Sequence, residues 1–119
     1  MPILHKNWEV LNGETLNFNI DYRQRDEIDP EQLDTVSLVN YRVRVPVKRM
    51  GQTLFELTEN NGIYKDALEG HIEITFTQNQ ISSLISKLPI DYSVYLDNIY
   101  DINDRYAILR GRIKVMTNA

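Results

Sequence analysis

The chain of 119 residues contains no cysteine, only five glycines, four prolines and two histidines. The absence of cysteine excludes disulfides, thiol nucleophiles, zinc–thiolate centres and iron–sulfur clusters. It also favours assembly in a reducing cytoplasm, because small secreted domains often depend on disulfides. The five glycines stand apart from one another, so no glycine-rich phosphate-binding loop is present. We therefore expect no cofactor.

Long apolar runs and an excess of basic residues are also lacking. Residues 1–13 show neither the charged start nor the apolar centre of a signal peptide. No apolar stretch approaches the ~20 residues that a helix needs to cross a bilayer. The formal net charge is −4, whereas a nucleic-acid-binding domain normally carries a basic surface. We therefore expect a soluble protein whose partners include neither a membrane nor a nucleic acid.

No arrangement of residues indicates catalysis. His5 and His71 lie far apart in the sequence, and no Gly-x-Ser-x-Gly motif is present. The carboxylates gather in turns, where a fixed separation between two of them is hard to hold. The oxygen-rich turn that includes Asp101 fails the spacing of a calcium-binding EF-hand loop, because Arg105 stands at its fifth position and no glycine follows. We expect a hairpin turn there, no metal site and no enzymatic activity.

Alternation of apolar and polar residues with a period of two is the strongest positive signal. Leu16, Phe18 and Ile20, for example, alternate with asparagines, as in a strand with one buried and one wet face. Similar segments lie within residues 3–11, 15–22, 36–47, 53–58, 70–77, 90–97 and 107–115. About seven short strands in a chain of this length are typical of an immunoglobulin-like sandwich with Greek-key connections. We therefore predict an all-β, two-sheet sandwich of about seven antiparallel strands, forming a single domain over residues 1–119.

Three local signals refine this prediction. Residues 77–80 have the Thr-x-x-Gln form of a capping box, which predicts one short helix over about residues 78–87 that ends before Pro89. Pro46 cannot donate to a β-ladder, so this part of its strand should lie at an edge or end in a bulge. Tyr92 follows the helix and begins a strand, a placing that resembles the tyrosine corner of immunoglobulin-like sandwiches.

Candidate interaction residues are found in three groups. The acidic segment 23–35 is long for a connection in a compact domain. A basic cluster over residues 42–49 either meets an acidic partner or protects a solvated strand edge. Exposed tyrosines favour interfaces, and Trp8 is either a core or a surface residue. The candidate residues are Arg23, Arg25, Asp26, Glu27, Asp29, Glu31, Arg42, Arg44, Tyr64, Tyr95 and Tyr100.

The order of motifs along the chain resembles a known family. A GHIEITF strand leads into a helix of the form Thr-x-x-Gln-x-x-x-Leu, a tyrosine-rich strand, a turn and Leu-x-Gly-x-Ile-x-Val. This order resembles the immunoglobulin-like N-terminal module of phage baseplate upper proteins and similar small tail- or fibre-associated phage proteins. The matching residues are Gly70, Ile72, Ile74, Thr77, Gln80, Leu84, Tyr92, Tyr95, Leu109, Gly111, Ile113 and Val115. The chain departs from the pattern in lacking a glycine in its last hairpin, and we expect the docking module alone, without a coiled coil or a receptor-binding domain.

The resemblance implies a structural protein of the virion, assembled in the host cytoplasm. Such a docking module would be present in several copies and would join a tail, baseplate or neck to another virion protein through surface contacts. A capsid decoration protein is a second role open to a free-standing sandwich. A carbohydrate- or host-surface-binding module is an alternative from another class, and it requires at least two of the rings of Trp8, Tyr64, Tyr95 and Tyr100 on one exposed face. A small carbohydrate-active enzyme is a third, which would need two inward-facing carboxylates, and no strand supplies one.

Overall fold

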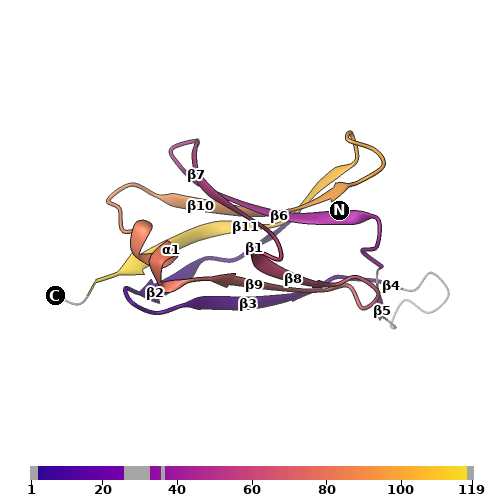
Figure 1. Cartoon of the computed structure of the whole chain (residues 1–119), viewed down its shortest axis with the longest axis horizontal. Helices are drawn as coiled ribbons and strands as arrows, with labels where there is room; N and C mark the ends of the chain where they lie inside the picture. The colour runs from indigo at the N-terminus through magenta and orange to yellow at the C-terminus, as the bar shows by residue number, and fades with distance from the viewer. Residues whose placement is uncertain (1–2, 26–32, 36, 118–119) are drawn as a thin grey trace.

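A computed structural model describes residues 3–25, 33–35 and 37–117. Two layers of strands pack on each other, with one short helix, α1, at one end (Figure 1). The strands are β1 (Leu4–His5), β2 (Trp8–Leu11), β3 (Leu16–Asp21), β4 (Arg23–Arg25), β5 (Leu33–Thr35), β6 (Tyr41–Arg49), β7 (Gln52–Glu59), β8 (Gly62–Asp66), β9 (His71–Phe76), β10 (Ile90–Asn98) and β11 (Arg105–Met116), and α1 spans Gln78–Ser83. β4 and β5 pair only with each other and form a separate arm.

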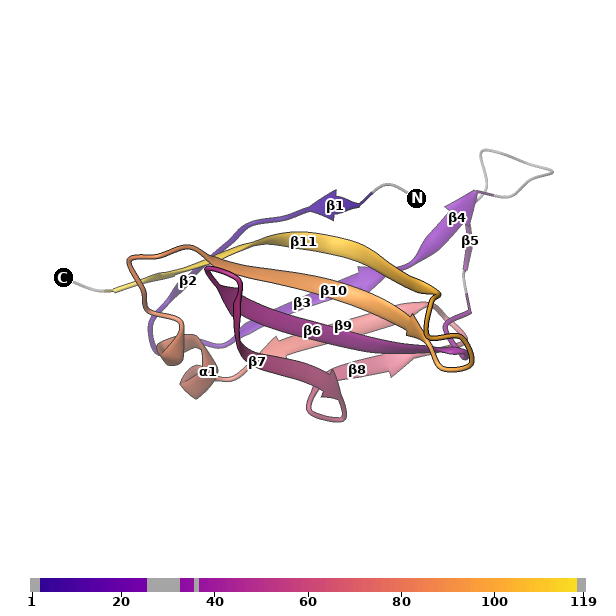
Figure 2. The ribbon, with the colours of Figure 1, turned by 90° about the horizontal axis from the view of Figure 1, so that it is seen from above.

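The two layers are formed by one curled sheet with the order β1-β11-β10-β6-β7-β8-β9-β3, and β2 extends the pairing along β11. The upper layer of Figure 1 contains β11, β10, β6 and β7, which lie side by side in Figure 2. The lower layer contains β3, β9 and β8. Two facing sheets with these pairings are the arrangement of immunoglobulin-like sandwiches. The predicted all-β sandwich is therefore confirmed, although not all pairings are antiparallel, because β1 and β2 run parallel to β11 and β8 runs parallel to the end of β7.

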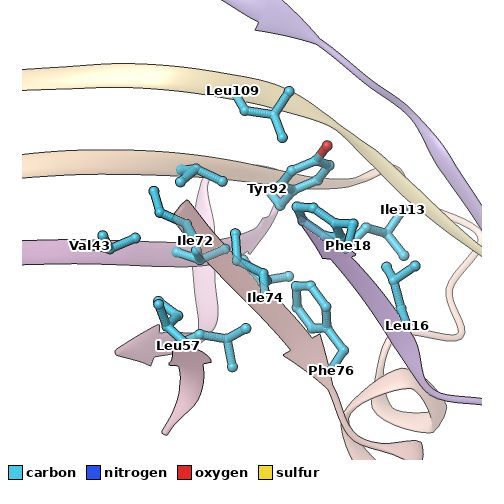
Figure 3. Close-up of a cluster of buried hydrophobic side chains, with 14 of the residues drawn as sticks. Leu16, Phe18, Val43, Leu57, Ile72, Ile74, Phe76, Tyr92, Leu109 and Ile113 are labelled. Carbon is cyan, nitrogen blue, oxygen red and sulfur yellow. The ribbon is translucent and has the colours of Figure 1, made fainter. Parts of the chain in front are cut away.

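The core lies between the layers and is formed by the inward residues that the alternation predicted. Val43, Val45 and Val47 of β6 are fully buried, as are Ile72 and Ile74 of β9. Figure 3 shows side chains of the two layers meeting around Phe18 and Tyr92. Each fully buried aliphatic side chain contributes roughly 1.5–3 kcal/mol through the hydrophobic effect.

The helix begins as predicted and ends earlier than residue 87. Thr77 and Gln80 form both hydrogen bonds of the capping box, at 3.2 Å and 2.9 Å. The hydroxyl of Ser83 donates to the Gln80 carbonyl at 2.6 Å, an acceptor that the next helical turn would use. The Leu84 N–H instead donates to the carbonyl of Ile81, so the last turn tightens and the helix stops.

Of the two alternatives for the strand around Pro46, the edge position is wrong and the bulge is confirmed. Pro46 lies in β6, which pairs with both β10 and β7 and is not an edge strand. The β6–β10 ladder is interrupted opposite Pro46 and resumes in the same register, and a register shift follows between Val47 and Lys48 in the pairing with β7. β8 was not predicted, because Ile63 is the only fully buried residue of this short strand.

The N-terminal strands are fixed to the core by the hydroxyl of Tyr92. This hydroxyl donates to the carbonyl oxygen of Lys6 at 2.6 Å and accepts from Nε1 of Trp8 at 2.9 Å. Its bonds therefore reach the start of the chain, whereas a tyrosine corner bonds to backbone a few residues upstream. Burial raises the pKa of Tyr92 to about 12. The Trp8 ring stacks on Phe18 with 4.7 Å between centroids, so Trp8 is a half-buried core residue.

We expect Gly111→Ala to destabilise the fold by about 3 kcal/mol or more. A Cβ at this position would overlap the backbone carbonyl of Lys6, which cannot move without breaking its bond to Tyr92. Gly13→Ala is the control, because Gly13 has a positive φ of 94° and open space around it, and a cost of about 1 kcal/mol follows from strain alone. Urea unfolding of both variants measures the difference, and equal losses would contradict the steric explanation.

We expect Met50→Asn to stabilise the protein by about 0.5–1 kcal/mol. Met50 and Gly51 form the two-residue turn between β6 and β7 with φ of 50° and 82°. A turn with two positive φ values favours the Asn-Gly pair. Met50→Ala removes the same exposed side chain without the preference for positive φ, so an asparagine variant no more stable than the alanine variant in thermal unfolding would refute this account.

Candidate interaction surfaces

The outer face of the upper layer carries a concentration of cations, which we call the basic face. Residues paired across neighbouring antiparallel strands project from the same side of a sheet. Asp91 of β10 is therefore flanked by Lys48 and Arg112, and Asp97 is flanked by Arg42 and Arg105. The cations of the basic face are Arg42, Arg44, Lys48, Arg105, Arg110, Arg112 and Lys114.

One end of the basic face is an ordered ion-pair network. A carboxylate oxygen of Asp97 lies 2.9 Å from Nε of Arg44, and the other lies 2.9 Å from Nε of Arg105. The hydrogen bond to Asp97 raises the pKa of Arg44, and its guanidinium lies 4.6 Å from the ring centroid of Tyr95. The fold thus brings together Arg42, Arg44 and Tyr95, three of the residues singled out from the sequence.

The middle of the basic face is less compensated. The whole basic face carries four carboxylates, Glu9, Glu56, Asp91 and Asp97, against the seven cations named above, and only Asp91 lies near its middle. A hollow of about 330 Å³ opens there, lined by His5, Asn7, Asp91, Tyr92, Ser93, Arg110, Gly111 and Arg112. The hollow lies beside the contact between Gly111 and the Lys6 carbonyl. The path of the N-terminal strand along β11 therefore shapes both the contact and the hollow. It offers guanidinium, imidazole, amide and hydroxyl groups, the donor set that suits an anionic group.

The outer face of the lower layer carries the opposite charge, and we call it the acidic face. Asp21 of β3, Glu73 of β9 and Asp66 of β8 project from it, and the outward positions of these strands hold no lysine or arginine. The ring of His71 lies between two carboxylates, with Nδ1 2.8 Å from Asp21 and Nε2 3.3 Å from Glu73. These contacts raise the pKa of His71, with Asp21 as the larger cause.

One end of the sandwich exposes apolar side chains on turns, and we call this the loop end. Its members are Val39, Leu68, Ile99, Tyr100 and Ile102. Ile102, Tyr100 and Leu68 are 83%, 81% and 74% exposed, the highest values among the large hydrophobic residues that the structure describes. The turns between β8 and β9 and between β10 and β11 extend from this end of the sandwich (Figure 1).

Backbone hydrogen bonds connect the parts of the loop end. The Leu38 N–H donates to the carbonyl of Ala67 at 2.7 Å, and the Ile99 N–H donates to that of Asn40 at 3.0 Å. Asp104 fixes the base of the last turn by accepting from the Tyr41 hydroxyl at 3.1 Å and the Asn98 amide at 2.8 Å. The pKa of Asp104 is lowered by hydrogen bonds, and the bond from Tyr106 is the largest cause. The predicted Asn-Asp hairpin turn is confirmed, and its apolar tips are held on a fixed base.

The other residues singled out from the sequence are spread over the molecule. Tyr64 is exposed on the acidic face opposite Glu73, and Tyr100 belongs to the loop end. Arg23 and Arg25 lie in β4 of the arm, where only the backbone of Arg25 is described. Asp26, Glu27, Asp29 and Glu31 lie outside the described residues.

Sequence reasoning missed two parts of these surfaces. Arg110, Arg112 and Lys114 alternate in the last strand, and this alternation was a readable sign of a basic strand face. Leu68, Ile99 and Ile102 stand in polar turns. An isolated apolar residue in a polar turn was the signal that could have predicted an exposed apolar surface.

Within residues 3–25, 33–35 and 37–117, no three histidine or acidic residues lie together in a way that would hold a metal ion. Across the same ranges, no helix has the length and apolar character needed to span a membrane.

The strand pairing alone places the chain among immunoglobulin-like sandwiches. No protein-family model matches the sequence, and no curated protein matches it. A solved structure of the Drosophila OTK extracellular domains 3–5 is similar at 14% identity with a TM-score of 0.42, over 92% of this chain and 32% of that one. The chain thus spans about a third of that structure, and the similarity is too distant to support an inference about function.

We expect the imidazole of His71 to titrate above its usual pKa of 6.5. A raised pKa means that the protonated ring stabilises the folded state. This contribution is fully present below the unfolded-state pKa and is lost as the pH rises through the folded-state value. NMR titration should show that Asp21→Asn lowers the pKa of His71 more than Glu73→Gln, because the contact with Asp21 is shorter. An unchanged pKa in Asp21→Asn would contradict this expectation.

Proposed function

We propose that this chain is a structural docking module that joins protein components of a phage tail, baseplate or tail fibre. The loop end is the observation that supports docking most directly. Its three most exposed side chains add nothing to the core of the domain. Several large hydrophobic residues exposed at one end of a domain mark an interaction site more often than single scattered ones do.

The chemistry of the loop end favours a protein as the occupant. Protein interfaces have an apolar centre and a polar rim, and they are enriched in aromatic residues such as tyrosine. Here the apolar tips are bordered by Glu69 and Asp101, both exposed. A carboxylate rim would repel an anionic lipid surface and would suit a partner with lysine or arginine around an apolar recess.

The virion setting is supported by the resemblance of the strand, helix and turn motifs to phage baseplate upper proteins. Phage tails and baseplates are assembled from repeated structural proteins, and a module that acts through surface contacts is suited to that role. A capsid decoration protein would use the same kind of surface, and identification of the co-purifying protein separates the two roles.

The carbohydrate-binding alternative is less well supported by the arrangement of aromatic rings. Tyr95 and Tyr64 project from opposite outer faces of the sandwich, because they belong to β10 and β8. Trp8 stacks on Phe18 and bonds to Tyr92, and Arg44 covers the Tyr95 ring. Tyr100, the fourth candidate ring, belongs to the loop end, so the four rings do not form one open stacking platform.

We expect the double variant Tyr100→Ser, Ile102→Ser to enter native particles at least about tenfold less than the wild type, the equivalent of ~1.4 kcal/mol of contact energy. Both side chains are exposed, so the thermal unfolding midpoint should be unchanged. Quantitative mass spectrometry of purified particles measures the incorporation and identifies the tail or head protein that accompanies the chain.

The matched control is Met50→Asn, which replaces an exposed hydrophobic residue in the β6–β7 turn at the other end of the sandwich (Figure 1). It should be incorporated like the wild type. Equal incorporation of all three proteins would remove the loop end from the docking surface. Recovery of the wild type only as a free monomer, without any particle protein, would overturn the proposed function.

A further inference from the structure

We infer that the basic face docks on the acidic face of a second copy of this chain, so that copies stack head to tail. The inference rests on the proposed docking function and names the partner of the two sheet faces. Two observations support it: the two faces have opposite charge, and the basic face has a hollow that can receive a carboxylate. Because the two faces differ, their contact generates a stack or a ring.

The separation of charge is the first observation. The whole chain has a formal charge of −4, yet seven of its 13 lysines and arginines project from the basic face. Arg42, Lys48, Arg110 and Lys114 form no ion pair with any residue that the structure describes. The opposite face has carboxylates at Asp21, Asp66 and Glu73, two of which also contact the ring of His71, and it holds no lysine or arginine at its outward strand positions. Two faces of opposite sign on one rigid sandwich are complementary to each other in a second copy.

The hollow on the basic face is the second observation. It lies among His5, Ser93, Arg110 and Arg112, where the only carboxylate is Asp91, 3.4 Å from Arg112. On the acidic face, the side chains of Asp21 and Glu73 are about half exposed, and the amides of Asn17 and Asn19 border them. A projecting carboxylate of one copy thus matches a recessed group of donors on the next.

The area of the contact indicates how strong it is. β3, β8 and β9 have five or six residues each, which at ~3.3 Å per residue and ~4.8 Å between strands gives a face of about 20 Å by 15 Å. That is less than the ~800 Å² that each partner contributes to a standard interface. We therefore expect a weak contact between isolated copies that depends strongly on salt and gains strength when copies are held together in an assembly.

The two faces are different surfaces of one chain, so the contact is heterologous and produces rings or open stacks. Because the faces lie above and below the sandwich in Figure 1, whereas the loop end lies at its side, stacking leaves the loop end uncovered. Each copy in a stack would keep its own docking site for the second component.

The test uses sedimentation velocity at chain concentrations on the order of 0.1–1 mM, where weak contacts are populated. We expect the average mass of the wild type to rise with concentration at about 20 mM salt and to remain that of a monomer at about 500 mM, since the screening length falls from ~20 Å to ~4 Å. The basic-face variant, Arg110→Gln with Lys114→Gln, and the acidic-face variant, Asp21→Asn with Glu73→Gln, should each associate at least about tenfold more weakly.

Mixing the two variants gives the decisive result. The basic-face variant keeps an intact acidic face, and the acidic-face variant keeps an intact basic face. An equimolar mixture should therefore form a one-to-one pair. No stack of more than two copies should appear. Lys87→Glu is the control, because Lys87 is exposed in the connection between α1 and β10, and it should associate like the wild type.

Two results would overturn the inference in distinguishable ways. A wild type that stays monomeric at low salt but binds heparin, the polyanion used as a probe, would show that the basic face has another anionic partner. The docking function would then be tested separately by the particle experiment. A wild type that neither self-associates nor enters particles would refute the inference and the proposed function together.

Discussion

The two hydrogen bonds of the Tyr92 hydroxyl are the interaction on which the rest of the structure depends. Tyr92 is 1% exposed, so its hydroxyl has to find partners inside the protein. It finds them in the Lys6 carbonyl and in Trp8, which belong to the start of the chain. Trp8 stacks on Phe18, and Phe18 in turn faces Phe76 at 6.4 Å. One phenol thus joins the N-terminal strands, the first part of β10 and the aromatic centre of the lower layer.

The same contact also shapes the outer surface. β1 gives way to β2 around Lys6 and Asn7, and the side chain of Asn7 accepts the N–H of Arg112 that regular pairing would otherwise satisfy. This change of strand is possible because Gly111 has no side chain. The hollow between Arg110 and Arg112 opens next to it. A packing requirement of the core therefore determines where donors are exposed on the basic face.

The sequence was a good guide where burial alone determines structure. Period-two alternation located the core residues of β3, β6, β9 and β10, because each strand has one face in the core. It did not locate β8, whose single buried residue gives no period, nor the parallel pairing of β1 and β2, which depends on non-local contacts. For Pro46 the sequence left an edge position and a bulge open, because the choice between them depends on whether β7 and β10 both lie beside β6.

The candidate surfaces were predictable only in part for a related reason. Arg42, Arg44 and Tyr95 were recognised as exposed charged or aromatic residues of strands. Their assembly with Arg105, Arg110 and Arg112 depends on which strands are neighbours, and local sequence does not contain that information. Turn residues have no periodicity, so nothing in the sequence indicated that Leu68 and Ile102 would lie at the same end of the sandwich.

The parallel pairing of the first and last strands has a mechanical consequence. Leu4 pairs with Leu109 at the start of β1, and Leu11 pairs with Met116 near the end of β11. A pulling force applied through Leu4 and Met116 acts along these strands in opposite directions, so the hydrogen bonds between them carry the load together and do not break one after another. Resistance to force depends on the rate of unfolding and not on equilibrium stability. The fold is therefore suited to transmitting tension between whatever is attached at its two ends.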